Sequence, residues 1–149
     1  MKNYMTFKNV KVEEMSRLEY VESRGWKLPA NEEQLKDERV FKVFYPDGYV
    51  SMCPKKTFLR TAYEIHKDNK IPNELVDGFI IEKEVKTERI LGQLMTVVNA
   101  KLRNGMVLVE TTSCVDEANY SEEIGAGICL ENIKNKLWFT LGFMLKCTQ

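Results

Sequence analysis

The fold is decided by residues 95–145, MTVVNAKLRNGMVLVETTSCVDEANYSEEIGAGICLENIKNKLWFTLGFML. Two β-rich runs in this stretch are separated by Asn104-Gly105, a pair that tolerates the positive φ angles of a type I′ turn. The later part of the stretch has apolar residues at helical spacing. We therefore expect an antiparallel hairpin that leads into one long helix.

The predicted two-residue turn also fixes the register of the hairpin. Counting back from Arg103 opposite Met106 places one set of side chains on the core face. The predicted core pairs are Leu102 with Val107, Ala100 with Val109, Val98 with Thr111 and Thr96 with Ser113. The predicted opposite face is mixed and polar, with Arg103, Lys101, Asn99, Glu110 and Val97.

The long helix is expected to begin after a polar corner at residues 116–120. Asn119 or Ser121 can cap its first amide groups, and the glutamates that follow favour the positive end of the helix dipole. The apolar side is predicted to consist of Ile124, Ile128, Leu130, Ile133 and Leu137. Residues 125–127, Gly-Ala-Gly, predict close packing of another helix, within the chain or across a dimer. The apolar residues 138–145 predict docking or burial in an oligomer.

The first half of the chain predicts a second, smaller α+β arrangement. Residues 4–11 alternate in the manner of a strand, and residues 12–25 have helical spacing that ends at Gly25. Residues 45–49, YPDGY, have the proline and glycine of a tight reversal between two strands. A short helix is expected to open at Pro54, with Phe58, Leu59, Ala62 and Ile65 as its buried stripe.

A charged segment at residues 66–70, HKDNK, is typical of a break between compact units. We therefore predict two domains, residues 1–69 and residues 70–149. Residues 80–89 are compatible with a strand or with the tail of a helix. The expected fold class is α+β, with two small modules that each contain an antiparallel β-hairpin, and with a long C-terminal helix.

Composition limits the classes of function. Lys and Arg total 22 and Asp and Glu total 22, so the chain has no net charge that would attract duplex nucleic acid. The four cysteines, Cys53, Cys114, Cys129 and Cys147, contain no Cys-x-x-Cys pair and predict free thiols in a reducing cytosol. No apolar run reaches the roughly 20 residues needed to cross a membrane, and the first residues lack the pattern of a secretion signal.

Residues 113–146 resemble the gp-forty-nine-like family of small tailed-phage proteins, in which a strand and Asn-Gly turn precede a corner and a helix. The positions that match are Ser113, Cys114, Val115, Asp116, Ala118, Asn119, Tyr120, Glu123, Ile124, Gly125, Glu131, Asn132, Lys136 and Trp138. The resemblance covers about residues 71–149. Departures from the pattern are Glu117 in place of proline, Tyr120 in place of phenylalanine, and Phe139-Thr140 in place of Pro-Leu. Residues 1–69 resemble short phage proteins with a PDGYVSWSPK-type core, with Met52 at the tryptophan position.

The resemblance implies a phage protein that works in the cytosol of the host bacterium. Phages encode small oligomeric proteins that defeat host defence, among them sponges that sequester the nucleotide signals of Thoeris and CBASS systems. The leading expectation is therefore a homo-oligomeric sponge for a cyclic ADP-ribose isomer or a cyclic dinucleotide. The alternative is a protein-binding phage accessory that inhibits a host protein or serves phage replication or assembly.

Five residues are the candidate ligand contacts of such a sponge: Tyr120, Asn132, Asn119, Arg103 and Lys136. An aromatic ring can stack on a base, amides can bind base or ribose edges, and cations can bind phosphate. Each residue also has a structural interpretation. Tyr120 can pack the start of the helix, Asn132 can be a locally bonded or surface amide, and charges beside a turn are often solvated.

The inventory of catalytic side chains argues against an enzyme. His66 is the only histidine, which removes paired-histidine and histidine-rich metal sites. Three carboxylates, those of Asp116, Glu122 and Glu123, could hold magnesium, but helix capping explains them with fewer assumptions. We therefore expect no catalysis, no metal and no cofactor.

Overall fold

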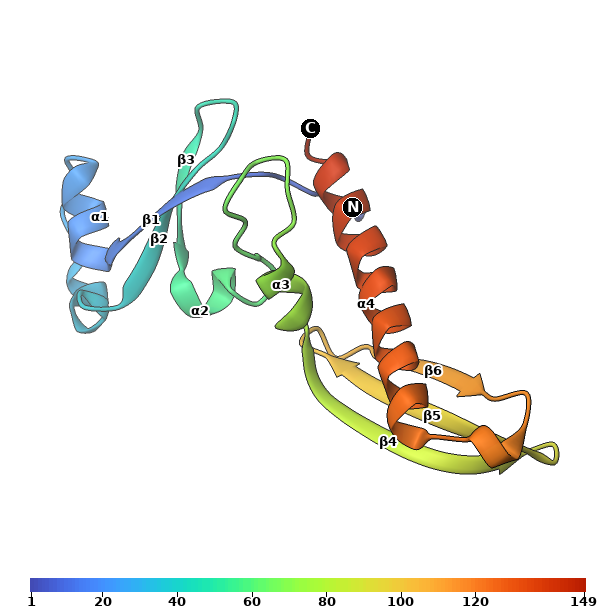
Figure 1. The fold of residues 1–149 in the computed structure, drawn as a ribbon. Helices are drawn as coiled ribbons and strands as arrows, with labels where there is room; N and C mark the ends of the chain where they lie inside the picture. The colour runs from blue at the N-terminus through green and yellow to red at the C-terminus, as the bar shows by residue number, and fades with distance from the viewer. The chain divides into compact units, whose positions relative to one another are not determined.

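The computed structural model describes residues 1–149, which form two compact units. Unit 1 comprises Met1–Glu64 with Cys147–Gln149, and unit 2 comprises Ile65–Lys146. Each unit contains an antiparallel three-stranded sheet, and unit 2 also contains a long helix (Figure 1). The predicted α+β class is confirmed, and each predicted hairpin is part of a larger sheet. The division into two domains, residues 1–69 and residues 70–149, stays a prediction.

Unit 1 is built on the strand order β1-β2-β3. Its elements are β1 (Lys11–Ser16), α1 (Arg17–Ser23), the 3-10 helix η1 (Ala30–Leu35), β2 (Arg39–Phe44), β3 (Val50–Pro54) and α2 (Lys55–Phe58). A small core forms around Tyr20, Val21 and Val40. Met15, Leu28 and Met52 pack against it.

The first strand and helix begin later than their sequence patterns predicted. Ser16 caps α1, because its hydroxyl accepts a hydrogen bond from the Glu19 amide at 3.1 Å and its own amide donates to the Glu19 carboxylate at 2.6 Å. This capping box fixes the start of the helix at Arg17. Met15, expected on the helix, is therefore in β1 opposite Val40.

The YPDGY reversal is confirmed. Gly48 has a φ of +84°, and its amide donates to the Tyr45 carbonyl at 3.0 Å. The Tyr49 amide donates to the Asp47 carboxylate at 3.0 Å. The predicted helix after Pro54 is shorter than expected. α2 is one turn long, Lys55–Phe58, so Ala62 and Ile65 lie beyond it, and Leu59 is exposed.

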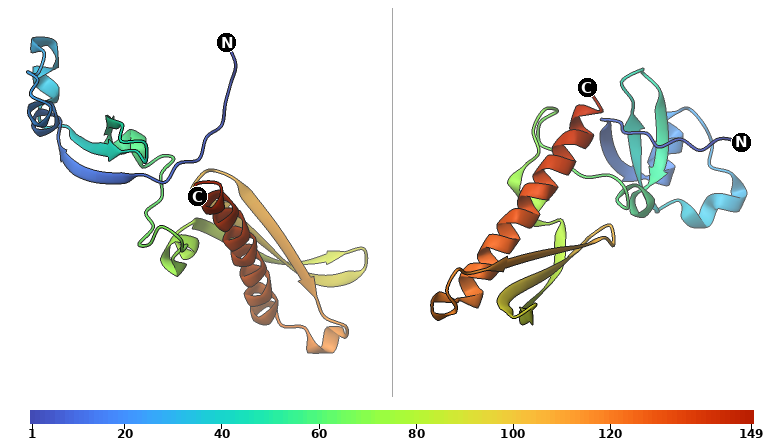
Figure 2. Two further views of the ribbon diagram at one scale, coloured as in Figure 1. Left: turned by 90° about the horizontal axis from the view of Figure 1, so that it is seen from above. Right: turned by 90° about the vertical axis from the view of Figure 1, so that its right-hand side faces the viewer.

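Unit 2 has the strand order β4-β5-β6, with a long helix across one face of the sheet (Figures 1 and 2). Its elements are α3 (Asn73–Asp77), β4 (Ile80–Ile90), β5 (Gln93–Leu102), β6 (Val107–Ser113), the 3-10 helix η2 (Glu117–Asn119) and α4 (Glu122–Lys146). The segment that was compatible with a strand or a helix tail is a strand.

The type I′ turn predicted at Asn104-Gly105 is wrong. Only Gly105 has a positive φ, +89°, and Asn104 instead accepts a hydrogen bond from the Met106 amide at 3.0 Å. The Gly105 amide donates to the Leu102 carbonyl at 2.8 Å. The loop therefore has three residues, with glycine in its left-handed position. A two-residue loop with two positive φ angles occurs instead at Leu91-Gly92, between the paired Ile90 and Gln93.

The longer loop shifts the register of β6 by one residue. Ala100 pairs with Leu108 rather than Val109. On β5 the predicted core face is confirmed, since Thr96, Val98, Ala100 and Leu102 are buried. Val97, predicted on the polar face, is buried as well. On β6 the shift turns the other residues inward, namely Leu108, Glu110 and Thr112. Val107 and Val109 are exposed, because a one-residue slip reverses the faces of a strand.

The buried side of α4 also differs from the prediction. Its buried residues are spaced by four: Gly125, Cys129, Ile133, Leu137 and Leu141. Ile133 and Leu137 were predicted correctly, whereas Ile124 and Ile128 are exposed. The glycine at position 125 contacts the sheet and not another helix, because a Cβ there would lie 2.8 Å from Thr96 Cβ and 3.1 Å from Thr112 Cγ2.

The four cysteines are free. Cys129 is fully buried on the side of α4 that faces the sheet, and burial raises the pKa of its thiol. A thiol held in its neutral form is a poor nucleophile. Cys147 is the exposed cysteine of the chain.

Candidate functional site

A row of threonines crosses the inner face of the sheet beneath the start of α4. Thr87 in β4 is opposite Thr96 in β5, and Thr96 is opposite Thr112 in β6. Residues directly opposite each other in antiparallel strands point to the same face. We call Thr87, Thr96 and Thr112 the threonine row.

Tyr120 reaches the threonine row from the corner before α4. Its hydroxyl lies 2.8 Å from Thr87 Oγ1 and 2.8 Å from Thr96 Oγ1. Thr87 also donates to the carboxylate of Glu122 in the first turn of the helix. Thr96 is fully buried, so the Tyr120 hydroxyl satisfies a polar group that water does not reach. The hydroxyl of Tyr120 thus holds the start of α4 against the sheet.

Replacing Tyr120 by phenylalanine is expected to lower the free energy of unfolding of unit 2 by about 1–2 kcal/mol, because Thr96 loses a partner in a buried place. Urea denaturation followed by circular dichroism measures the change. Thr111→Val is the control, since Thr111 is an exposed threonine of β6, and its effect is expected to stay within about 0.5 kcal/mol. Equal effects for the two variants would contradict this role of Tyr120.

The corner itself is held by several side-chain contacts. Asp116 caps η2 by accepting from the Ala118 amide at 2.9 Å. Arg89 at the end of β4 forms two hydrogen bonds with the Glu117 carboxylate, at 2.6 and 3.0 Å. This pairing lowers the pKa of Glu117 and raises the pKa of Arg89. Of the two predicted caps, Ser121 accepts a hydrogen bond from Ile124 at 3.4 Å, while Asn119 is exposed beside it.

Asn132 and Lys136 lie one turn apart on the exposed surface of α4. The Lys136 ammonium pairs with the Glu110 carboxylate of β6. Glu110 points to the inner face, and only 14% of its side chain is exposed. Lys136 therefore balances the negative charge of a largely buried carboxylate, which is a structural role.

Replacing Lys136 by glutamine is expected to lower the free energy of unfolding by about 1 kcal/mol, because Glu110 keeps its charge and loses its cation. Lys134→Gln is the matched control. Lys134 pairs with Asp77 at 2.6 Å, but both of these side chains are about half exposed, and such pairs contribute little. Thermal melts of the two variants would contradict the assignment if Lys134→Gln were the more destabilising change.

Arg103 lies in the loop between β5 and β6, at the other end of β5 from Thr96. Its amide donates to the Phe79 carbonyl at 2.9 Å, which connects this loop to the segment before β4. The side chain is exposed.

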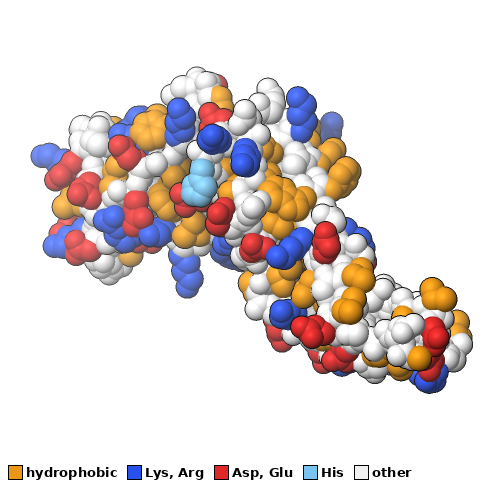
Figure 3. Space-filling model, in the orientation of Figure 1, with side chains coloured by type: hydrophobic (Ala, Val, Ile, Leu, Met, Phe, Trp, Pro, Cys, Tyr) orange, Lys and Arg blue, Asp and Glu red, His pale blue; other side chains and the backbone are white.

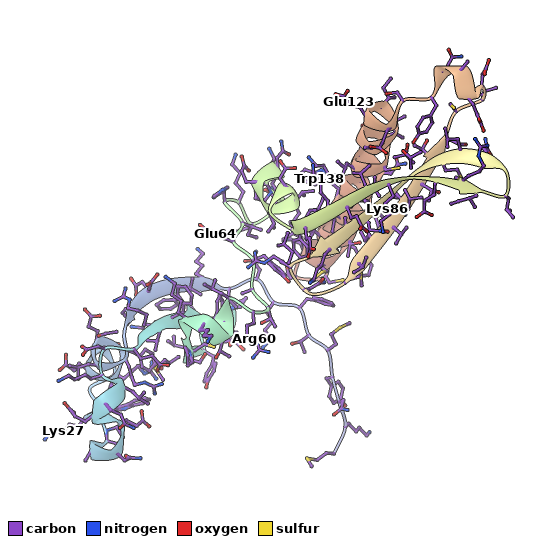
Figure 4. All side chains as sticks on the ribbon, turned by 90° about the horizontal axis from the view of Figure 1, so that it is seen from below. Lys27, Arg60, Glu64, Lys86, Glu123 and Trp138 are labelled. Carbon is purple, nitrogen blue, oxygen red and sulfur yellow. The ribbon has the colours of Figure 1, made fainter.

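The structure brings the five predicted contacts together only in part. Asn119 adjoins Tyr120 at the corner, and Asn132 adjoins Lys136 on the helix. Asn119 and Tyr120 precede the helix, and Asn132 lies ten residues beyond its first residue, Glu122, which is about 15 Å along the axis at 1.5 Å per residue. Arg103 lies at the far end of the sheet. Figure 4 labels two residues of this helix, Glu123 in its first turn and Trp138. Trp138 is 15 residues further along, which is about four turns at 3.6 residues per turn. Within one chain, the five side chains do not surround a common ligand site.

The threonine row, Arg89 and Glu110 were not predicted to be parts of this region. Their importance depends on side-chain contacts between the strands and the corner or the helix. These contacts join residues 24 to 35 positions apart in the chain, such as Thr96 with Tyr120 and Thr87 with Glu122. The only signal in the sequence was Glu117 itself, a charged residue at a position where the resembling family has proline. The structure supplies its partner, Arg89.

No three His, Cys, Asp or Glu side chains are grouped in a way that could hold a metal ion. None of the helices combines the length and the apolar composition that a membrane-spanning helix requires.

The sequence model of the phage protein (N4 Gp49/phage Sf6 gene 66) family matches residues 61–148. The match covers more than half of the chain and includes every strand and helix of unit 2. The chain belongs to this family. The resemblance noted in the C-terminal half is therefore confirmed, and the family region begins about ten residues earlier than expected.

The matched region thus contains the sheet and the long helix of unit 2, and the Tyr120 corner lies within it. None of the curated proteins and none of the solved structures compared with the chain matches it. The resemblance of residues 1–69 to short phage proteins stays a prediction.

Proposed function

We propose that this phage-family protein acts by binding a protein partner, without catalysis, in the cytosol of the infected bacterium. The polar side chains of the corner argue against catalysis there, because they are paired with one another. Tyr120 bonds two threonines, and Arg89 is engaged by Glu117. No nucleophile and base are paired there in the way that covalent catalysis requires.

The two edge strands of the sheet in unit 2 differ sharply in charge, and the proposal rests on this difference. At one edge, six of the eleven residues of β4 are charged, IIEKEVKTERI. Charged side chains are the usual means of preventing strand addition at an edge. At the other edge, β6 (VLVETTS) has one charged residue, Glu110, which points inward to Lys136. Its exposed valines, Val107 and Val109, are 54% and 55% accessible.

An unprotected apolar edge fits an extended segment of a partner protein. Such a segment adds a strand to the sheet: backbone hydrogen bonds supply affinity, and alternate side chains supply specificity. The exposed Val107 and Val109 offer an apolar surface to the side chains of that segment. This arrangement corresponds to the protein-binding accessory role, which we favour over nucleotide capture.

Affinity recovery from phage-infected cells tests this role. The wild-type protein is expected to retain a specific host or phage protein, and Val107→Lys/Val109→Lys is expected to lose it, because the added charges protect the edge. Asn132→Ala is the matched control and should retain the same partner, since Asn132 lies on α4. If the β6 variant still retained the partner and Asn132→Ala lost it, the β6 edge would be rejected as the binding surface.

A second candidate is the capture of a host cyclic nucleotide signal. It is supported by the exposed Asn132 and by the Asn119-Tyr120 corner, which offer amides and an aromatic ring. Lys136 could bind a phosphate only by leaving its partner, Glu110. Because these groups are far apart in one chain, an enclosed site would have to be completed by a second copy. Melting shifts with a panel of cyclic dinucleotides and cyclic ADP-ribose isomers test the candidate. Unchanged ligand recovered after denaturation would establish sequestration, and an altered ligand would establish an enzyme.

A further inference from the structure

An exposed ridge of α4 has an unusual order of side chains. It contains six residues, Ile124, Ile128, Asn132, Asn135, Phe139 and Phe143, which we call the outer ridge. At 100° per residue these positions fall within about 100° of one another around the helix axis. The four apolar members are exposed by 66% (Ile124), 45% (Ile128), 78% (Phe139) and 61% (Phe143). Hydrophobic side chains reach the surface between charged ones along the part of the molecule where α4 lies (Figure 3).

The outer ridge is symmetric about the middle of the helix. When an identical helix is placed antiparallel beside it, Ile124 lies at the level of Phe143, Ile128 at the level of Phe139, and Asn132 at the level of Asn135. Each pair is equidistant from a point between Ile133 and Lys134. A surface that matches its own reverse is what a two-fold symmetric interface requires, because the same patch must serve both partners.

We propose that the outer ridge pairs with the outer ridge of a second copy of this chain, with the two helices antiparallel. An isoleucine of one copy then packs beside a phenylalanine of the other at four levels. The central level contains asparagines from both copies. A polar pair inside an apolar helix seam favours one register, because any other register buries its amides against apolar side chains.

Charge is compatible with this pairing. None of the six ridge residues is charged, although 30% of the residues in the chain are. The charged residues on the two flanks, Glu131 and Lys136, have opposite signs. Two identical helices can therefore approach without bringing a concentration of like charge together.

The area is sufficient for a dimer of modest stability. Taking roughly 200 Å² for a large apolar side chain, the exposed parts of the four apolar residues amount to roughly 500 Å² per copy. Two copies would bury roughly 1,000 Å², which is near the lower limit for a specific interface. We therefore expect a dimer whose population depends on protein concentration.

Sedimentation over a concentration series tests the association. The wild-type protein is expected to form a dimer, and Phe139→Asp/Phe143→Asp is expected to weaken it by about 100-fold or more. Val115→Asp is the control, since Val115 is fully exposed outside the ridge and should leave the dimer intact. Circular dichroism should show the same helix content for all three proteins. A wild-type monomer at all concentrations, or a dimer that is insensitive to the two aspartates, would overturn the proposal.

Disulfide crosslinking tests the antiparallel order. Two single variants, Ile128→Cys and Phe139→Cys, are prepared with Cys53, Cys114 and Cys147 replaced by serine. In the proposed pairing, position 128 of one copy lies beside position 139 of the other, so the mixture should form a crosslinked heterodimer under oxidation. Each variant alone should not crosslink, because its two cysteines would be about 16 Å apart along the axis. Self-crosslinking of either variant without heterodimer formation would show a parallel pair and overturn the proposal.

Discussion

Replacing Ile133 by alanine is expected to lower the free energy of unfolding of unit 2 by about 3 kcal/mol. Ile133 is fully buried at the middle of α4, where the helix crosses the sheet. Removal of a buried isoleucine side chain loses its transfer free energy and leaves a cavity, because its neighbours relax only partly. Urea denaturation monitored by circular dichroism measures the change.

Ile81→Ala is the control for this prediction. Ile81 is an isoleucine of the same unit with 58% of its surface exposed, so its replacement is expected to cost less than about 1 kcal/mol. Similar losses for the two variants would mean that Ile133 is not in the core. In that case the helix would contact the sheet through a different face.

The second large effect is expected for Gly125→Ala, with a loss of about 2 kcal/mol. A Cβ at this position would overlap Thr96 Oγ1 and lie 2.8 Å from Thr96 Cβ. Thr96 cannot move away easily, because it is fully buried and bonded to Tyr120. Over-packing of this kind typically costs about 1–3 kcal/mol, which exceeds the gain of about 1 kcal/mol from replacing glycine in a helix.

Gly127→Ala provides a matched control in the same turn of the helix. No atom lies within 4 Å of a Cβ at Gly127, so only the gain in helix propensity remains, up to about 1 kcal/mol of added stability. Thermal melts of the two variants should therefore shift in opposite directions. A stabilising Gly125→Ala would show that α4 does not approach the sheet closely at this turn.

Local signals in the sequence predicted the fold well where they act alone. The YPDGY reversal and the start of α4 depend on residues next to each other, and both were found as expected. The choice between two apolar faces of α4 could not be made in this way. Ile124 and Ile128 are more hydrophobic than Gly125 and Cys129, yet the small residues face the sheet because they allow a close approach to Thr96.

The prediction of the β5–β6 register was wrong for a similar reason. Asn104-Gly105 fits a two-residue loop, but it also fits the three-residue loop that was found. The difference moved Val107 and Val109 to the exposed face and Glu110 to the inner face. The proposed function depends on the apolar edge that results from the observed register, and no local sequence pattern indicated this register.

The candidate site was predicted less completely than the fold. Tyr120 was identified as a notable residue, but its partners, Thr87 and Thr96, come from strands distant in sequence. Asn132 was proposed as a ligand contact, and the structure places it on the outer ridge. Its unfavourable position within a helix has a physical reason in the proposed dimer, where it marks the register of the helix pair.

Hydrogen exchange of the complex with the recovered partner tests most directly the central claim that unit 2 binds a protein segment at the edge of β6. Backbone amides of Val107–Ser113 that face away from β5 are expected to gain protection when the partner is bound, since strand addition places them in new hydrogen bonds. Protection confined to residues 119–120 and 132–136, with β6 unchanged, would contradict the account and favour a ligand site on the corner and the helix.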